Sequence, residues 1–186
     1  STDDIMPRAF VAGDACHTHS PKGGWGLNTS LPDTFNLGWK LAAVLKKRST
    51  FKLLATYGTE RREVAQQLIN ADKELSKLVA TRPSASDISE KARVDTAKIE
   101  AFMKRQSGFV SGTSIEYLPS YICTGHDNQY LAKGLIIGQR FFSAEAIRLC
   151  DGRSQHLGHL IKADGRWRIF LFSGDEDPRD HNAKSY

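Results

Sequence analysis

The residues best suited to chemistry lie between positions 13 and 28. Asp14 follows an apolar run in a Gly-Asp pair, and its carboxylate can accept hydrogen bonds from ligand hydroxyls. Glycines at 23, 24 and 26 let main-chain N–H groups face a ligand. A helix predicted to begin near residues 28–30 would add unpaired N–H groups and about half a positive charge. The segment therefore predicts a site for an anion or a cofactor.

Other kinds of site fit this segment less well. No Gly-Lys-Ser/Thr sequence follows the glycines, as a P-loop requires, and the order Gly-Gly-Trp-Gly at 23–26 does not fit GxGxxG. His17 and His19 could form a metal site with Cys16 and Asp14. Ligands this close in sequence lack a distant partner and would strain the loop, so we predict no metal.

The elements around the segment follow from periodicity. Residues 9–12 are apolar and end at Gly13-Asp14, which predicts a buried strand. A loop leads to a helix that begins near residues 28–30, with Asn28, Thr29 or Ser30 as its cap and Pro32 in its first turn. Apolar residues at helical spacing predict one core-facing side, formed by Leu27, Leu31, Phe35, Gly38, Leu41, Ala42 and Leu45.

The rest of the chain predicts helices first and strands later. Helical periodicity covers residues 52–79 and 89–105, and the charged run Glu60-Arg61-Arg62 suggests a salt-bridged helix face. An irregular strand is expected over 109–122, and strands over 135–142, 146–149 and 167–172, with turns at Asp151-Gly152 and Asp164-Gly165. The fold class is therefore α/β, with a boundary between residues 122 and 134.

Composition restricts the class of partner. The chain has 186 residues, 40% of them hydrophobic, and a mean hydropathy of −0.42, which is typical of a globular protein without a membrane span or signal peptide. The net charge is +5, but the basic residues are scattered, so nucleic-acid binding is not expected. Three widely spaced cysteines form no disulfide framework, which suggests a reducing compartment, the cytoplasm.

Residues 13–42 resemble the second FAD motif of class A flavin monooxygenases, GDAxHxxxPxxGxGxNxxxxDxxNLxWKLA. The spacing is kept at Gly13, Asp14, Ala15, His17, Pro21, Gly24, Gly26, Asn28, Asp33, Asn36, Leu37, Trp39, Lys40, Leu41 and Ala42. The helix that follows is similar to the family's next helix at Tyr57, Glu60, Arg61, Arg62, Val64, Ala65, Leu68, Ile69 and Asp72. Residues 109–120 and 134–175 look like the phenol 2-monooxygenase group.

The resemblance implies two domains. Residues 1–122 would be the C-terminal part of a Rossmann-like FAD-binding domain. Residues 123–186 would be a partial thioredoxin-like α/β domain of the dimerisation type, and a homodimer is expected. The GxGxxG half of the FAD site and the substrate pocket are not in the sequence, so the chain is expected to be a fragment, inactive alone and without catalytic residues of its own.

The resemblance also implies roles for individual residues. The cofactor-binding set would be Gly13, Asp14, Pro21, Gly24, Gly26, Leu27 and Asn28. Asp14 would bond the ribityl chain of FAD, and the main chain around Pro21 would lie by the reactive edge of the isoalloxazine ring. The N–H groups of residues 26–28 would face its pyrimidine side. NADPH would reduce the flavin, which with oxygen would hydroxylate a phenolic ring beside its hydroxyl.

Four departures from the family pattern are Trp25 for Gln, Leu27 for Met, Pro32 for Gln and Gly58 for Glu. A ring as large as Trp25 could crowd the flavin or the substrate entrance. One alternative is a non-catalytic assembly or dimerisation module, or a degenerate gene product, that does not bind flavin. Another is a different flavin monooxygenase branch, acting on hydroxybenzoates or polyketides.

Overall fold

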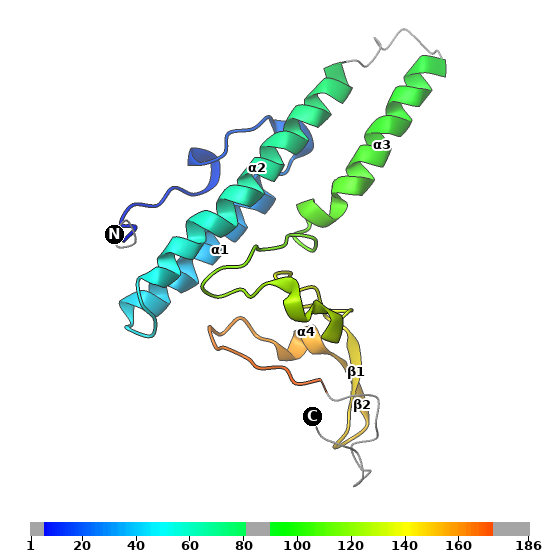
Figure 1. Cartoon of the computed structure of the whole chain (residues 1–186). Coiled ribbons are helices and arrows are strands. Elements are labelled where there is room, and N and C mark those ends of the chain that lie inside the picture. Colours follow the sequence, from blue (N-terminus) through cyan, green and yellow to red (C-terminus); the bar gives the residue numbers. More distant parts are fainter. Residues whose placement is uncertain (1–5, 81–89, 173–186) are drawn as a thin grey trace. The chain divides into compact units, whose positions relative to one another are not determined.

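The computed structural model describes residues 6–80 and 90–172, and these confirm the mixed α/β class (Figure 1). By its contacts the chain divides into two compact units, Ser1–Phe142 and Ser143–Tyr186. No helix in the described ranges is long and apolar enough to cross a membrane.

Three helices build the first unit. They are α1 (Gly26–Leu45), α2 (Lys52–Ala80) and α3 (Glu90–Val110), and α2 packs against both of the others (Figure 1). Short 3-10 turns precede and follow them at η2 (Gly13–Ala15), η3 (Pro21–Gly23) and η4 (His126–Leu131). The prediction of a helix over 52–79 is confirmed almost to the residue.

The described part of the second unit, residues 143–172, contains a hairpin and a short helix. Strand β1 (Glu145–Arg148) pairs antiparallel with β2 (Arg153–His156), and α4 (Leu157–Leu160) follows. This hairpin confirms the strand predicted near residues 146–149 and its turn, where Gly152 adopts a φ of +68°. The positive φ explains why a glycine ends the turn.

Two apolar clusters stabilise the helices of the first unit. One contains Trp25 and Phe102 with Leu68, Ala71 and Leu75 of α2, and the other joins Val44 to Leu53 and Leu54 at the turn between α1 and α2. An ion pair between Arg105 and Glu74 adds a surface link from α3 to α2. The first cluster places the loop before α1 against both longer helices.

Helix α1 buries the opposite side from the one predicted. Its buried residues are Thr29, Asp33, Asn36, Lys40 and Val44, which form one stripe at helical spacing. The predicted apolar side is exposed, with Leu31 at 60% and Phe35 at 68%. The reason is the surface of α2, where Glu60 and Arg61 are buried and pair with the polar stripe instead of forming an exposed charged face.

Several predicted element boundaries are wrong. Residues 9–12 and 167–172 form no strand, and residues 135–142 contribute only Gln139, in an isolated bridge with Glu116. A strand needs a neighbour to accept its main-chain hydrogen bonds, and the described residues supply none beside 9–12 and 167–172. Helix α1 begins at Gly26, two residues early, and α3 continues to Val110, past the predicted end at residue 105.

Candidate functional site

An open hollow of about 710 Å³ lies where the Gly13 turn, the proline-glycine loop and the start of α1 meet. Its lining residues are Gly13, Asp14, Thr18, His19, Pro21, Gly24, Trp25, Gly26, Leu27 and Ser30. Six of the seven residues predicted to bind the cofactor are in this set. The seventh, Asn28, lies beside them, exposed in the first turn of α1.

Glycines allow the main chain to approach closely around the hollow. Gly13 and Gly24 have φ values of +62° and +64°, which side chains rarely tolerate. A Cβ on Gly26 would lie 3.0 Å from the His19 ring, whereas a Cβ on Gly24 would meet nothing within 4 Å. The backbone at Gly24 is therefore open to a ligand on one side.

The positive end of α1 faces the hollow. Trp25 occupies the N-cap position and supplies no side-chain hydrogen bond there. Thr29 N–H donates to Trp25 C=O at 3.1 Å, which begins the hydrogen-bond ladder of the helix. The N–H groups of Gly26, Leu27 and Asn28 precede that bond and are the donors that a helix leaves for a capping group or a ligand. This arrangement suits a ligand group with partial or full negative charge.

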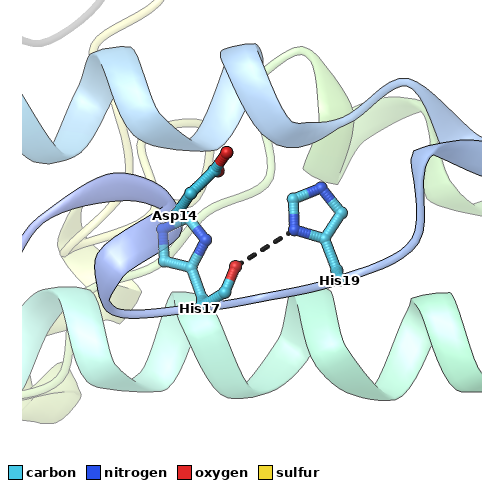
Figure 2. A group of neighbouring side chains, drawn as sticks. All are labelled: Asp14, His17 and His19. Atoms are coloured by element: carbon cyan, nitrogen blue, oxygen red, sulfur yellow. Dashed lines mark hydrogen bonds between the residues drawn. The ribbon is translucent and has the colours of Figure 1, made fainter.

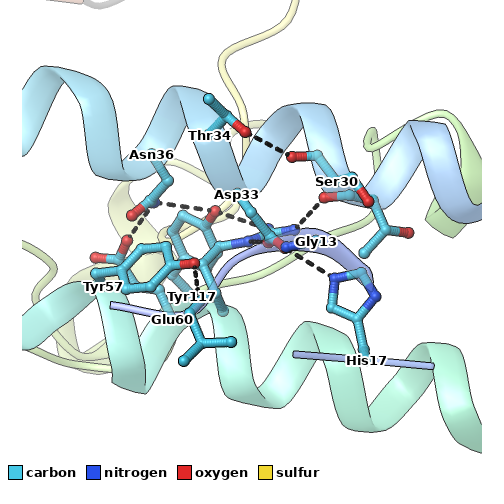
Figure 3. Close-up of polar contacts among 12 residues, drawn as sticks. Gly13, His17, Ser30, Asp33, Thr34, Asn36, Tyr57, Glu60 and Tyr117 are labelled. Atoms are coloured by element: carbon cyan, nitrogen blue, oxygen red, sulfur yellow. Dashed lines mark hydrogen bonds and ion pairs between the residues drawn. The ribbon is translucent and has the colours of Figure 1, made fainter. Parts of the chain in front are cut away.

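Asp33 of α1 holds the Gly13 turn through a hydrogen bond to its main chain (Figure 3). Its Oδ2 accepts the Gly13 N–H at 3.0 Å and the His17 Nε2–H at 2.8 Å, and its Oδ1 accepts Arg61 Nε–H at 2.5 Å. Burial alone would raise the pKa of Asp33, but hydrogen bonds from Arg61, His17 and Gly13 outweigh it and lower the pKa. Asp33 is thus an ionised anchor for the turn that carries Asp14.

A second buried pair, Lys40 and Glu60, joins the same two helices, and Glu60 is next to Arg61 in α2. Glu60 Oε2 accepts a hydrogen bond from Asn36 Nδ2 at 2.6 Å (Figure 3) and another from Lys40 Nζ, also at 2.6 Å. Tyr117 joins both pairs, because its hydroxyl accepts from Arg61 at 3.2 Å and from Asn36 at 3.4 Å. The network therefore connects α1, α2 and the segment after α3.

The loop between the Gly13 turn and α1 is attached to α2 by hydrogen bonds at Ser20 and by the packing of Trp25 against Leu68, Ala71 and Leu75. Asp72 accepts hydrogen bonds from the N–H and the hydroxyl of Ser20, at 2.9 and 2.5 Å. Trp25 is 2% exposed and packs beside Phe102, with ring centroids 6.0 Å apart. The indole that was expected to crowd the ligand is thus packed in the apolar core at the edge of the hollow.

Asp14, His17 and His19 form a polar cluster at this site (Figure 2). Their potential ligand atoms lie within 4.8 Å of one another. His17 already uses Nε2 on Asp33 and His19 uses Nδ1 on the His17 carbonyl at 3.1 Å, while His17 Nδ1 is buried without a hydrogen-bond partner. The exposed carboxylate of Asp14 suits a ligand rich in hydroxyls, and the predicted absence of a metal stays a prediction.

Sequence reasoning found the lining but not its supports. Asp33 and Asp72 stood in the sequence as motif matches without a role, because a side chain's partner 20 or 52 residues away cannot be identified from spacing. Arg61 was assigned to a salt-bridged helix face, and Tyr117 lay in a segment similar to the family, without a role of its own. Its role depends on how the segment after α3 returns to the helix pair.

Comparison with known proteins agrees with this geometry. Residues 6–72 match the family described as the FAD binding domain, and residues 115–185 match the phenol hydroxylase C-terminal dimerisation domain. A 3-hydroxybenzoate 4-monooxygenase of Comamonas testosteroni is 45% identical over 94% of this chain and 27% of that relative. A phenol 2-monooxygenase of Aspergillus fumigatus is 38% identical over 90% of this chain and 28% of its own length.

Solved structures give the same answer. Anhydrotetracycline hydroxylase OxyS from Streptomyces rimosus aligns with a TM-score of 0.58 and 28% identity, covering 81% of this chain and 28% of that one. The rebeccamycin biosynthetic enzyme RebC with reduced flavin aligns with a TM-score of 0.53 and 30% identity, covering 74% of this chain and 28% of that one. The chain spans under a third of the length of these relatives.

An FAD-binding segment followed by a phenol hydroxylase-type dimerisation segment defines a class of flavoprotein hydroxylase. Its two matched segments and its relatives make the chain similar to FAD-dependent aromatic hydroxylases, a phenol 2-monooxygenase among them. The residues present fit part of that cofactor. The uncapped helix end suits a ring that becomes anionic on reduction, and the exposed carboxylate of Asp14 in the hollow suits a hydroxyl-bearing chain.

Proposed function

We propose that this chain supplies the flavin-ring half of the FAD site in a monooxygenase that hydroxylates a phenolic ring. The observation that carries the proposal is the single hollow at the start of α1, which gathers six of the seven expected cofactor residues. Asp14 would accept hydrogen bonds from ribityl hydroxyls. The main chain at Pro21 would border the reactive edge of the ring.

The N-terminus of α1 would stabilise the charge of the reduced flavin ring in this half-site. Bound FAD, reduced by NADPH, supplies the oxygen chemistry of such enzymes. The N–H groups of Gly26, Leu27 and Asn28 would donate to the pyrimidine side of the ring, where negative charge gathers on reduction. Asp33 and Arg61 would keep the Gly13 turn in place beneath it. The role proposed for these residues is to bind the cofactor, so we assign no catalytic residue here.

The names of the relatives support a phenolic substrate. A 3-hydroxybenzoate 4-monooxygenase and a phenol 2-monooxygenase both, by name, introduce oxygen next to an existing ring hydroxyl. A 6-methylpretetramide 4-monooxygenase of Streptomyces rimosus is 33% identical, so polyketide rings are the alternative substrate class. We favour the simple phenol, with conversion to a catechol, because the more similar relatives carry such names.

Flavin retention tests the cofactor assignment. The purified chain is incubated with excess FAD and desalted, and the visible absorbance of retained flavin is measured. We expect retention by the parent chain and its loss in Asp14→Ala, with Asp127→Ala, an exposed carboxylate on η4, as the matched control. No retention by the parent chain would favour the alternative, an assembly module that does not bind flavin.

We propose further that residues 123–186 belong to a domain that joins two copies of the protein, with the FAD-binding part ending at residue 122. The dimerisation family matched over 115–185 supports this. Analytical ultracentrifugation of the chain should give twice the monomer mass of 20.7 kDa. Cys16, Cys123 and Cys150 are unpaired thiols, which is consistent with our placement of the enzyme in the cytoplasm.

A further inference from the structure

We propose that Asp72 is a positioning residue that holds the rim of the flavin site, formed by residues 20–24, on helix α2. The proposal rests on the function proposed above and extends it to a residue that does not line the hollow. Asp72 would act through Ser20 and Pro21, without touching the cofactor itself.

The geometry is that of a two-point attachment. Asp72 Oδ2 accepts the Ser20 N–H at 2.9 Å and Oδ1 accepts the Ser20 hydroxyl at 2.5 Å, so both oxygens are engaged by one residue. Two donors on two oxygens fix the orientation of the carboxylate as well as its distance. Because α2 is a 29-residue helix, Asp72 is attached to the most extended element of the unit.

Ser20 is where this attachment has its effect. It is the N-cap residue of η3, directly before Pro21, and Gly24 closes the turn by donating its N–H to the Pro21 carbonyl at 3.1 Å. Pro21 and Gly24 both line the hollow. A movement of Ser20 would therefore move the main chain that is expected to border the ring.

The other end of the rim is fixed by different means. Trp25 follows Gly24 and is packed among Leu68, Ala71 and Leu75 of the same helix. Between the two ends, Lys22 makes only an exposed contact of 3.4 Å with Ser76. The rim is thus held by a polar contact before it and an apolar one after it, and only the polar contact can be removed without opening the core.

These contacts separate positioning from folding. Asp72 lies at the half-buried margin of α2, so removing its carboxylate should leave the Trp25 cluster and the buried ion pairs intact. A hydrogen bond to a charged group is worth enough to change a binding constant about tenfold. We therefore expect weaker flavin binding with little change in the unfolding temperature.

The test titrates FAD into the full chain and follows flavin fluorescence and the visible circular dichroism of the bound ring. Asp72→Ala and Ser20→Ala should each weaken binding about tenfold and change the dichroism, and the double variant should be no weaker than either single one. Asp72→Asn keeps one acceptor oxygen, so its affinity for FAD should fall between those of the parent and Asp72→Ala. Glu63→Ala, which removes an exposed carboxylate from the same helix away from the rim, is the control and should bind like the parent.

The outcomes distinguish the two proposals. If the parent chain binds no FAD, both the function and the role of Asp72 are overturned. If the parent binds and Asp14→Ala does not, while Asp72→Ala binds with the parent's affinity and dichroism, only the role of Asp72 fails. Additive losses in the double variant would also contradict it, since residues 20 and 72 would then act separately.

Discussion

Gly23 and Trp25 fit each other so closely that a Cβ atom on the glycine would lie 2.6 Å from the indole ring. The ring cannot move aside easily, because it is 2% exposed among side chains of α2 and α3. The departure from the family pattern at residue 25 is therefore accommodated by the absence of a side chain at residue 23.

Gly23→Ala should consequently destabilise the chain by about 1–3 kcal/mol, the usual cost of overfilling a packed site. Urea unfolding followed by Trp fluorescence measures the change. Gly58→Ala is the control, because its Cβ would meet nothing within 4 Å inside helix α2, and alanine there should stabilise by about 0.5–1 kcal/mol. In a Trp25→Leu background the penalty at residue 23 should shrink; an unchanged penalty would show that the indole is not its cause.

Asp33→Asn should be among the most damaging single changes. It leaves the buried guanidinium of Arg61 without its anionic partner, and breaking a buried pair in this way costs about 3–5 kcal/mol. Asp127→Asn, on the exposed surface, should cost almost nothing. Chemical denaturation of both variants gives the comparison, and equal stabilities would contradict the anchoring role of Asp33.

Low pH should remove the stabilisation that the ionised carboxylate of Asp33 contributes. The pKa of Asp33 is lowered in the folded chain, so its stabilisation is present above the ordinary value of 3.8 and is lost as pH falls through the lower folded value. The gap in unfolding free energy between parent and Asp33→Asn should therefore persist at pH 5 and narrow only below about pH 4. A gap that closes near neutral pH would assign the effect to another group.

Tyr57 should respond at the alkaline end. Burial, together with Asp33 and Cys16, raises its pKa from 10.0 to about 12, and its hydroxyl donates to the Val11 carbonyl at 2.7 Å. Because the folded pKa is the higher one, this stabilisation is complete below pH 10 and is lost between about pH 10 and 12. Spectrophotometric titration of the folded parent chain should show a phenol that ionises well above pH 10. This ionisation step should be missing from the Tyr57→Phe variant, and its persistence there would contradict the assignment.

Lys40 and Glu60 form the second buried pair, with Lys40 0% exposed. Lys40→Met should cost about 3 kcal/mol or more, because Glu60 keeps its charge in the interior. The double variant Lys40→Met, Glu60→Leu should recover most of this loss, since neither buried charge remains. Thermal unfolding of the three chains checks the order, and a double variant less stable than the single one would contradict it.

Much of the site was predictable because its chemistry depends on local sequence. The Gly13-Asp14 turn, the glycines at 24 and 26 and the helix start lie within fourteen residues, and the structure brings them to one hollow. Helix α2 was predictable from its own periodicity. The strand expected over residues 9–12 was not formed, because a strand depends on a neighbour that periodicity does not supply.

The side of α1 that is buried could not be predicted for a related reason. Leucine and phenylalanine at helical spacing normally indicate the core, yet here Leu31 and Phe35 are exposed while Asp33 and Lys40 are buried. What decides the matter is α2, whose Glu60 and Arg61 offer opposite charges to that stripe. The periodicity of a sequence describes one helix at a time, whereas the side of a helix that is buried depends on the helix packed against it.

The buried ion pairs between α1 and α2 also limit which substitutions this sequence can accumulate during evolution. A leucine in an ordinary core can be exchanged for methionine at small cost, but Asp33, Lys40, Glu60 and Arg61 each leave a stranded charge when they change alone. Descendants that keep this fold should therefore inherit these positions as matched sets, and a change at one should be accompanied by a change at its partner.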